Sequence, residues 1–179
     1  MVDKSLASYS IKDGIRFIGQ LAFKGCTSLT SITIPDTVID IGDSAFSGCS
    51  GHLIINSSVV ERDLWSATIR PANWVNLALF SKLTIGNNIK KVGGQQFYNC
   101  TSLTSVTIGN SVIEIGECAF GSCKNLTSIN IPDSVTAIRD NAFYRCTSLP
   151  TTNNIRYADT YLVEAVNKNL TEYTIKDGT

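Results

Sequence analysis

Apolar residues recur along this chain with a step of 23 residues. One unit is clearest between Leu29 and Cys49. Its apolar skeleton consists of Leu29, Ile32, Ile34, Val38, Ile41, Ala45, Phe46 and Cys49. The same skeleton occurs 23 positions earlier, and again in the units that begin at residues 103 and 126. Self-similarity at such a period predicts stacked coils that share one core.

The first apolar position of each unit marks the start of a coil. These starts lie near residues 6, 29, 52, 80, 103, 126, 149 and 170. The coil over 52–79 is too long and has His52 where leucine is expected, and the coil over 149–169 is too short. We predict a single domain over 1–179 with about seven to eight coils, and a β-hairpin or extra strand within 149–169.

Each coil carries signals for one strand and a return turn. The segment "LTSITI" alternates apolar and polar residues and is rich in β-branched residues, which predicts a short strand. Pro35 ends it, because proline cannot donate to a strand ladder. Gly42, Gly93 and Gly116 follow at a position where we expect a turn. The phrases "SAF", "CAF" and "NAF" predict a short helical or 3-10 turn that returns the chain to the start of the next strand. Successive strands then run in the same direction and stack as a parallel sheet.

The phrase "AFxGCxxLTSITIPDxVxxIG" keeps its Phe, Cys, Leu, Ile, Pro and Gly positions in register with the period. It resembles the BspA-like leucine-rich repeat family of bacterial surface proteins, from Leu6 to Lys176. The resemblance implies an α/β repeat solenoid, a right-handed leucine-rich repeat with a parallel sheet on its concave side and short helical or 3-10 turns outside. It also implies export, display at the cell surface or secretion, and a part in adhesion or ligand binding.

A near-identical phrase stands close to both ends of the chain. "YSIKDG" occupies Tyr9–Gly14, and "YTIKDG" occupies Tyr173–Gly178, 164 positions later. Leu170, Tyr173 and Ile175 then match strand positions of the first coil. We expect the chain to be a fragment of a longer array that continues after Thr179, with an open strand edge at the last coil that permits edge-to-edge association.

Charge and chain composition exclude several classes of protein. Fifteen basic and fifteen acidic residues balance, so no basic surface indicates nucleic-acid binding. No apolar stretch is long enough to cross a bilayer, and the first residues lack the apolar region of a signal peptide. We therefore expect no membrane insertion by this chain, and a monomer.

Few residues in the sequence offer chemistry. Five of the six cysteines recur with the period, one per coil, which is typical of a small buried side chain in a ladder; a disulfide between neighbouring coils is the alternative. Cys118 lies off this ladder and is expected to be a partly exposed thiol. His52 is the single histidine, and no pair of general base and nucleophile is recognisable. We expect no enzyme activity, no metal site and no cofactor.

Outward strand residues form the first candidate binding surface. They are small and mostly carry hydroxyl groups, which fits a protein or glycan ligand but equally fits ordinary strand propensity on a solvated face. They are Thr30, Ser31, Thr33, Thr104, Ser105, Thr107, Thr127, Ser128 and Asn130, with Thr84 beside them.

The irregular coil offers a second candidate surface. Its segment "VVERDLWSATIRPANWVNLALF" holds Arg62, Trp65, Arg70 and Trp74, and Trp and Arg are the residue types that dominate binding interfaces. Alternatively, both tryptophans cover the core where the coil bulges. Quenching of tryptophan fluorescence by acrylamide distinguishes the two hypotheses.

Three functions follow in order of preference. The first is a non-enzymatic surface module that binds an extracellular protein or glycan of unknown identity. The second is a structural spacer or stalk that displays other domains. The third is an ice-binding solenoid, because Thr-x-x-Thr rungs recur, although the irregular coil interrupts them.

Overall fold

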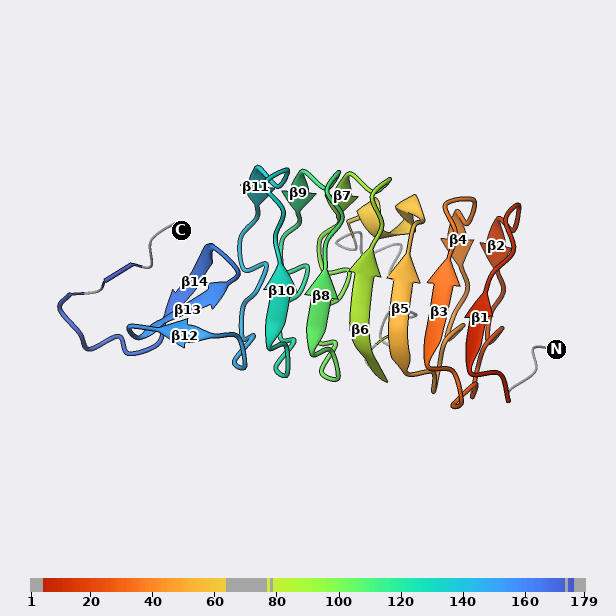
Figure 1. Ribbon diagram of the computed structural model, residues 1–179, viewed down its shortest axis with the longest axis horizontal. Coiled ribbons are helices and arrows are strands. Elements are labelled where there is room, and N and C mark those ends of the chain that lie inside the picture. The colour runs from red at the N-terminus through yellow and green to blue at the C-terminus, as the bar shows by residue number, and fades with distance from the viewer. Residues whose placement is uncertain (1–4, 64–76, 78, 173, 176–179) are drawn as a thin grey trace.

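The computed structural model describes residues 5–63, 77, 79–172 and 174–175 of the 179-residue chain. Its main wall is a six-stranded parallel sheet with the strand order β1-β3-β5-β6-β8-β10 (Figure 1). The strands are β1 (Ser8–Ser10), β3 (Ser31–Ile34), β5 (Gly51–Ile55), β6 (Phe80–Ile85), β8 (Ser105–Thr107) and β10 (Ser128–Asn130). Ile32 pairs with Tyr9, and Ile129 pairs with Val106, each 23 positions apart. The predicted parallel-sheet solenoid is confirmed.

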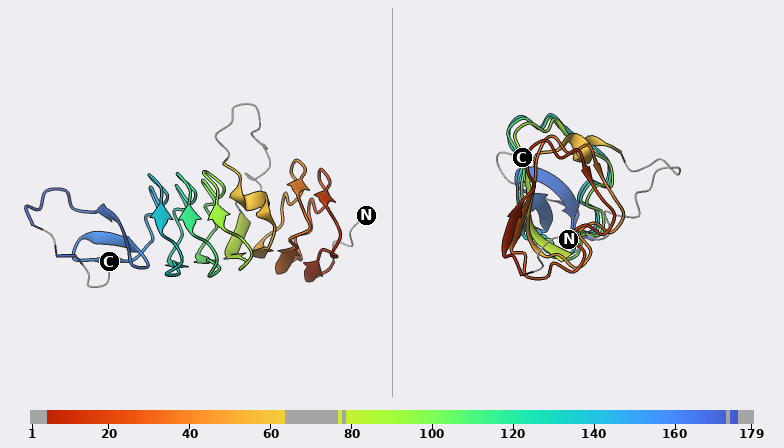
Figure 2. Two further views of the ribbon diagram at one scale, coloured as in Figure 1. Left: turned by 90° about the horizontal axis from the view of Figure 1, so that it is seen from above. Right: turned by 90° about the vertical axis from the view of Figure 1, so that its right-hand side faces the viewer.

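A second wall is built from shorter parallel strands. β2 (Phe17–Ile18) pairs with β4 (Asp40–Ile41), and β7 (Lys91–Val92), β9 (Glu114–Ile115) and β11 (Ala137–Ile138) form a three-stranded sheet. Between the two sheets lies the 3-10 helix η1 (Ser58–Glu61), which contacts β7. Seen along the solenoid axis, successive coils nearly superpose (Figure 2).

The third side of each coil consists of stacked single turns, in which an N–H donates to the carbonyl oxygen three residues earlier, as Lys24 does to Leu21 and Cys26 does to Phe23. Each of the five return turns that the structure describes in full contains two residues with left-handed backbone angles, four positions apart. These pairs are Leu21 and Gly25, Ser44 and Gly48, Gln95 and Asn99, Cys118 and Ser122, and Asn141 and Arg145. A left-handed residue every few positions interrupts a right-handed helix. Among the described residues, 3-10 helix is assigned to η1 and to Leu77 and Leu79, and the expected short helical or 3-10 turns of the other coils are single turns rather than continuous helices.

The third coil starts in a different register from the one that the sequence predicted. His52 pairs with Ser31, and Leu53 pairs with Ile32, so the step between these strands is 21 residues. Leu53 then pairs with Leu83, 30 residues later. Gly51 makes the short entry into β5 possible, because its φ is +92° and a Cβ there would overlap the carbonyl group of Thr30. His52 consequently occupies an outward position rather than that of the expected leucine.

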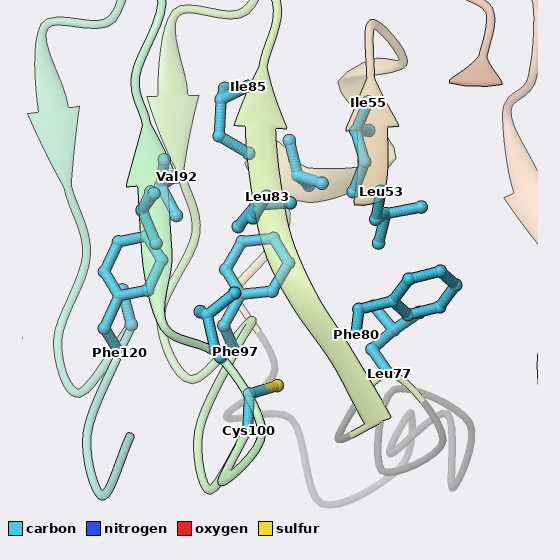
Figure 3. Close-up of a cluster of buried hydrophobic side chains, with 14 of the residues drawn as sticks. Leu53, Ile55, Leu77, Phe80, Leu83, Ile85, Val92, Phe97, Cys100 and Phe120 are labelled. Carbon is cyan, nitrogen blue, oxygen red and sulfur yellow. The ribbon is translucent and has the colours of Figure 1, made fainter. Parts of the chain in front are cut away.

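Apolar side chains of all coils meet in one continuous core between the walls. Figure 3 shows part of it, where Leu53, Leu83 and Ile85 pack above the rings of Phe80, Phe97 and Phe120. The rings of Phe97 and Phe120 stack with their centroids 5.3 Å apart and their planes 12° from parallel. Adjacent strands in a sheet are about 4.8 Å apart, which is less than the distance between the two ring centroids. The rings are therefore slightly offset, the arrangement that aromatic pairs prefer.

The second irregular coil folds as an antiparallel sheet at the C-terminal end of the solenoid (Figure 1). It comprises β12 (Thr151–Thr152), β13 (Ile155–Ala158) and β14 (Tyr161–Ala165), so the hairpin predicted within 149–169 is confirmed. Asn153 and Asn154 both have left-handed backbone angles, as a two-residue hairpin turn requires. Beyond it, the described residues 170–172 and 174–175 contain no strand, although the sequence predicted one there.

Candidate functional site

Outward side chains of the main sheet form two rows across the six coils. The first row contains Ser8, Ser31, His52, Lys82, Ser105 and Ser128. The second row contains Ser10, Thr33, Ile54, Thr84, Thr107 and Asn130. We call these two rows the outer face. Apolar residues between them point into the core, so the outer face is the polar side of an otherwise buried sheet.

Five of the nine strand residues predicted as ligand contacts lie on this outer face with their hydroxyl groups free. They are Ser31, Thr33, Ser105, Thr107 and Ser128. None of these hydroxyl groups makes a hydrogen bond within the described residues. Each is therefore available to an outside partner as both donor and acceptor.

The remaining four residues use their side chains to hold the coils together. The hydroxyl groups of Thr30, Thr104 and Thr127 donate to the carbonyl oxygens of Ala7, Ser81 and Thr104, at 2.8, 2.9 and 3.0 Å. Asn130 accepts from the Ile108 N–H at 2.9 Å and donates to the Ile108 carbonyl at 3.3 Å. Sequence alternation could not separate these residues from the free ones, because the partner atoms belong to the preceding coil.

His52 and Lys82 are the two ionisable side chains of the outer face. They lie side by side on β5 and β6, and the His52 ring nitrogen Nε2 is 2.9 Å from the Thr84 hydroxyl oxygen. Burial, together with the positive charge of Lys82, lowers the pKa of His52. The imidazole is therefore neutral at pH 7, and Lys82 carries the charge of this face.

The second predicted surface is only partly described. The Arg62 guanidinium donates to the Ile39 carbonyl at 2.6 Å and lies 3.8 Å from the Asp40 carboxylate, so it is held by the preceding coil. Trp65, Arg70 and Trp74 lie outside the described residues, and the proposed cluster of these residues stays a prediction.

Charged side chains line a hollow of about 380 Å³ on the second wall, which sequence reasoning missed. Lys91 lies 2.9 Å from Asp63 and 3.4 Å from Glu114, and Glu114 lies 3.1 Å from Arg139. The hydrogen bond to Asp63 raises the pKa of Lys91, and the bonds from Arg139 and Lys91 lower the pKa of Glu114. Because Asp63, Lys91, Glu114 and Arg139 pair with one another across neighbouring coils, we interpret these four as a ladder that joins coils, rather than as a ligand site.

A smaller hollow of about 210 Å³ lies where the outer face meets the C-terminal sheet. Its lining combines Thr127 and Ser128 with six residues that the sequence did not predict to be ligand contacts. They are Ile129, Leu149, Pro150, Thr152, Tyr157 and Asp159. The Asp159 carboxylate accepts a hydrogen bond from the Ile131 N–H at 2.7 Å. Asp159 reaches the site only because the hairpin folds back against β10, so its position depends on tertiary structure.

No group of three or more His, Cys, Asp or Glu residues that could hold a metal ion occurs in the part of the chain that the structure describes. Over the same residues, no helix is both long and apolar enough to span a membrane.

Comparison with known proteins identifies the repeat. The model of the BspA type leucine-rich repeat region matches residues 2–63 and 67–179, in 6 copies. A leucine-rich repeat protein from Bacteroides ovatus is 32% identical, with a TM-score of 0.56 over 80% of this chain and 36% of its own. A leucine rich cell surface protein from Faecalibacterium prausnitzii is 28% identical, with a TM-score of 0.46 over 82% of this chain and 31% of its own.

The chain thus spans about a third of the length of these two structures. Among curated proteins, none matches it significantly. The match of the repeat model covers nearly the whole sequence, and the parallel sheet of stacked coils is the structure that such repeats form. The chain therefore belongs to the BspA-type leucine-rich repeat family.

Proposed function

We propose that this chain is a non-enzymatic cell-surface module that binds an extracellular protein or glycan through the outer face of its main sheet. The observation that carries the proposal is the set of five free hydroxyl groups on that face. Neighbouring strands are about 4.8 Å apart, so a ligand meets donors and acceptors at a regular spacing. Export and surface display are part of the proposal, and membership of the family supports them.

The outer face is also preorganised for binding. Its serine and threonine side chains are short, so holding them in one conformation costs little entropy compared with long side chains. The strands that carry them are fixed by the sheet on both sides, except at β1 and β10. Because no carboxylate lies in the two outward rows, the face accepts neutral or anionic partners.

A structural spacer is the second candidate function. The described outward rows contain neither tryptophan nor arginine, the residue types that most often dominate binding energy. A spacer needs no ligand. The two functions therefore differ in one measurable property, which is whether the chain binds a ligand.

The test is a binding screen of the 179-residue chain against glycans and extracellular proteins. The double variant Thr33→Arg, Thr107→Arg places two long, positively charged side chains on the outer face and should abolish binding of any neutral ligand found. The control is Asp36→Asn, Asp133→Asn, which changes the net charge by the same amount at exposed turn positions, and it should bind as the wild type does.

Three results would change the interpretation. A folded chain that binds nothing in the screen supports the spacer. Equal loss of binding in both double variants indicates a general charge effect instead of contact at the outer face. If only a variant trimmed across 62–76 loses binding, the ligand is held by the irregular coil.

A further inference from the structure

We propose that the 210 Å³ hollow between β10 and the C-terminal sheet binds one neutral, hydroxyl-rich ring, such as the terminal hexose of a glycan. This inference rests on the proposed function, and it names the ligand class and the place on the outer face where specificity arises. We call this hollow the end pocket.

The end pocket offers an apolar wall and a polar edge. Ile129, Leu149 and Pro150 supply apolar surface, against which the C–H groups of a sugar ring can pack. Ser128 contributes a free hydroxyl group, and the Thr152 side chain is exposed beside it. Sites for small ligands typically combine an apolar lining with a few converging polar groups.

Asp159 is the main polar group of the end pocket. One carboxylate oxygen accepts the Ile131 N–H, and no hydrogen bond to the other oxygen occurs within the described residues. A carboxylate oxygen accepts hydrogen bonds and donates none, and its bonds are stronger than those between neutral groups. The free oxygen therefore suits the hydroxyl donors of a sugar.

The volume and charge of the end pocket restrict the class of ligand further. Pockets for drug-sized molecules usually hold about 300–1,000 Å³, so the end pocket suits a single ring rather than a chain segment. Asp159 is the only residue of its lining with an acidic or basic side chain, apart from the buried phenol of Tyr157. A carboxylate without a neighbouring cation repels anions, which favours neutral sugars over uronic or sialic acids.

The experiment is a titration of the ¹⁵N-labelled 179-residue chain, observed by two-dimensional NMR. The probes are the methyl glycosides of glucose, galactose, mannose and N-acetylglucosamine, with sodium glucuronate and methylammonium as comparators. We expect at least one neutral glycoside to shift the amide signals of Ser128, Ile131 and Asp159 together. Glucuronate should bind at least about tenfold more weakly, because its carboxylate is repelled by that of Asp159.

Two variants locate the binding. Asp159→Asn keeps a residue that tolerates the left-handed turn and an oxygen for the Ile131 N–H, and it should weaken sugar binding roughly tenfold. Ser128→Ala should weaken it by a smaller factor. The matched controls are Asp36→Asn and Ser111→Ala, which lie outside the outer face and the end pocket and should leave the titration unchanged.

Several outcomes would overturn the proposal. They are no shift with any neutral glycoside, tighter binding of methylammonium or glucuronate, and unchanged sugar binding in Asp159→Asn. If Asp159→Asn has no effect while Thr33→Arg, Thr107→Arg abolishes binding in the screen, the end pocket is wrong and the outer face stands. If the end pocket binds a sugar but the double variant keeps every ligand, the proposed role of the wider outer face is wrong instead.

Discussion

The thiol of a stacked cysteine has a hydrogen-bond partner that an alkyl side chain could not use. Cys49, Cys123 and Cys146 each donate to a phenylalanine carbonyl of the preceding coil at 3.1 Å. All five ladder cysteines are buried, as the sequence predicted, and all six cysteines are free thiols, so the alternative of a disulfide is not realised. Cysteine therefore fills a small apolar site and also joins adjacent coils.

The burial of these thiols predicts which cysteine reacts. Burial raises the pKa of Cys49 to about 11 and that of Cys100 to about 12, so both stay protonated at pH 8. Burial and the charge of Glu117 also raise the pKa of Cys118, but its thiol is partly exposed whereas the five ladder thiols are buried. Because a thiol reagent must reach the sulfur, the native protein should be modified at this one position. Mass spectrometry of the labelled chain should find one modified cysteine when native and six when unfolded.

Cys118→Asn provides the control for this labelling. Asparagine occupies the equivalent left-handed position at Asn141, so the substitution preserves the turn. Native labelling should then disappear. Rapid modification of any ladder cysteine would contradict the burial of these thiols.

Three repeat glycines are required by close packing rather than by a turn conformation. The sequence predicted that Gly42, Gly93 and Gly116 permit a turn, but none of them has a left-handed φ. A Cβ on Gly42 would lie 2.5 Å from the backbone nitrogen of Gln20 in the preceding coil. The absence of a side chain therefore allows the coils to approach each other.

We predict that Gly116→Ala destabilises the fold and that Gly19→Ala does not. The new Cβ of Gly116→Ala would lie 2.5 Å from the Gly94 nitrogen, whereas nothing lies within 4 Å of the corresponding position on Gly19. Forcing extra volume into packed structure costs about 1–3 kcal/mol. Urea unfolding at constant slope measures the difference, and equal midpoints for both variants would refute the packing argument.

At the scale of elements, Arg156 connects the C-terminal sheet to the last regular coil. Its guanidinium donates to the carbonyl oxygens of Cys146 and Thr147, and it pairs with the Glu164 carboxylate at 2.9 Å. All four residues of β13 are buried, and the ring of Tyr161 lies 6.0 Å from that of Phe143. The C-terminal sheet thus covers the core where no further parallel strand is present among the described residues.

Replacing Arg156 should loosen this end of the molecule. Arg156→Leu removes the donor to the Thr147 carbonyl and the partner of Glu164, whereas the Cys146 carbonyl still accepts from the Leu149 N–H. A buried polar group left unsatisfied costs about 1–3 kcal/mol. We expect a clear loss in urea stability and faster hydrogen exchange of the amides in β13 and β14. The control Arg139→Leu removes an arginine–glutamate pair at the surface and should have a much smaller effect.

A comparable loss of stability in the two arginine variants would show that Arg156 acts as an ordinary surface charge. Unchanged exchange in β13 and β14 would likewise contradict its role in attaching the C-terminal sheet.

At the scale of the whole molecule, the two ends of the solenoid differ. The first coil exposes Leu6, Ile15, Phe17 and Leu21, and lines an apolar hollow of about 210 Å³. Ile15 is 43% exposed, whereas Val38, its equivalent in the next coil, is fully buried. The C-terminal sheet gives the opposite end a cover that the first coil lacks among the described residues (Figure 1).

This asymmetry predicts a gradient of local stability along the axis. In a repeat protein each coil is stabilised mainly by its neighbours, and local opening is easiest where buried contacts are fewest. Amide exchange in 8–26 should therefore be faster than in 103–123, where strand and turn bonds occur on both sides. Hydrogen-exchange mass spectrometry tests this, and uniform protection across the coils would contradict it.

Much of the fold could be predicted from the sequence because its signals are local and repeated. Alternation in "LTSITI" determined which residues face the core, and the 23-residue step determined which of them stack, as Ile129 on Val106 confirms. The third coil was placed wrongly because Gly51 shortens the entry to β5, an effect of one glycine conformation that no periodicity reveals.

The sequence predicted which surface carries the candidate site, but not which of its side chains are free to bind. Sequence alternation placed Ser31 and Thr107 outward, but it could not show that the Thr104 hydroxyl is bonded to the coil before it. It also could not bring Asp159 beside Ser128, because that contact requires the hairpin to fold against β10.

The sequence by itself therefore determined the repeat, the buried ladders and the polar outer side of the sheet, since each follows from spacing along the chain. Only the tertiary structure decided the shape of the return turns, the charge ladder of Lys91 and Glu114, and the end pocket. These features depend on distances between coils, and such distances are fixed when the coils pack together.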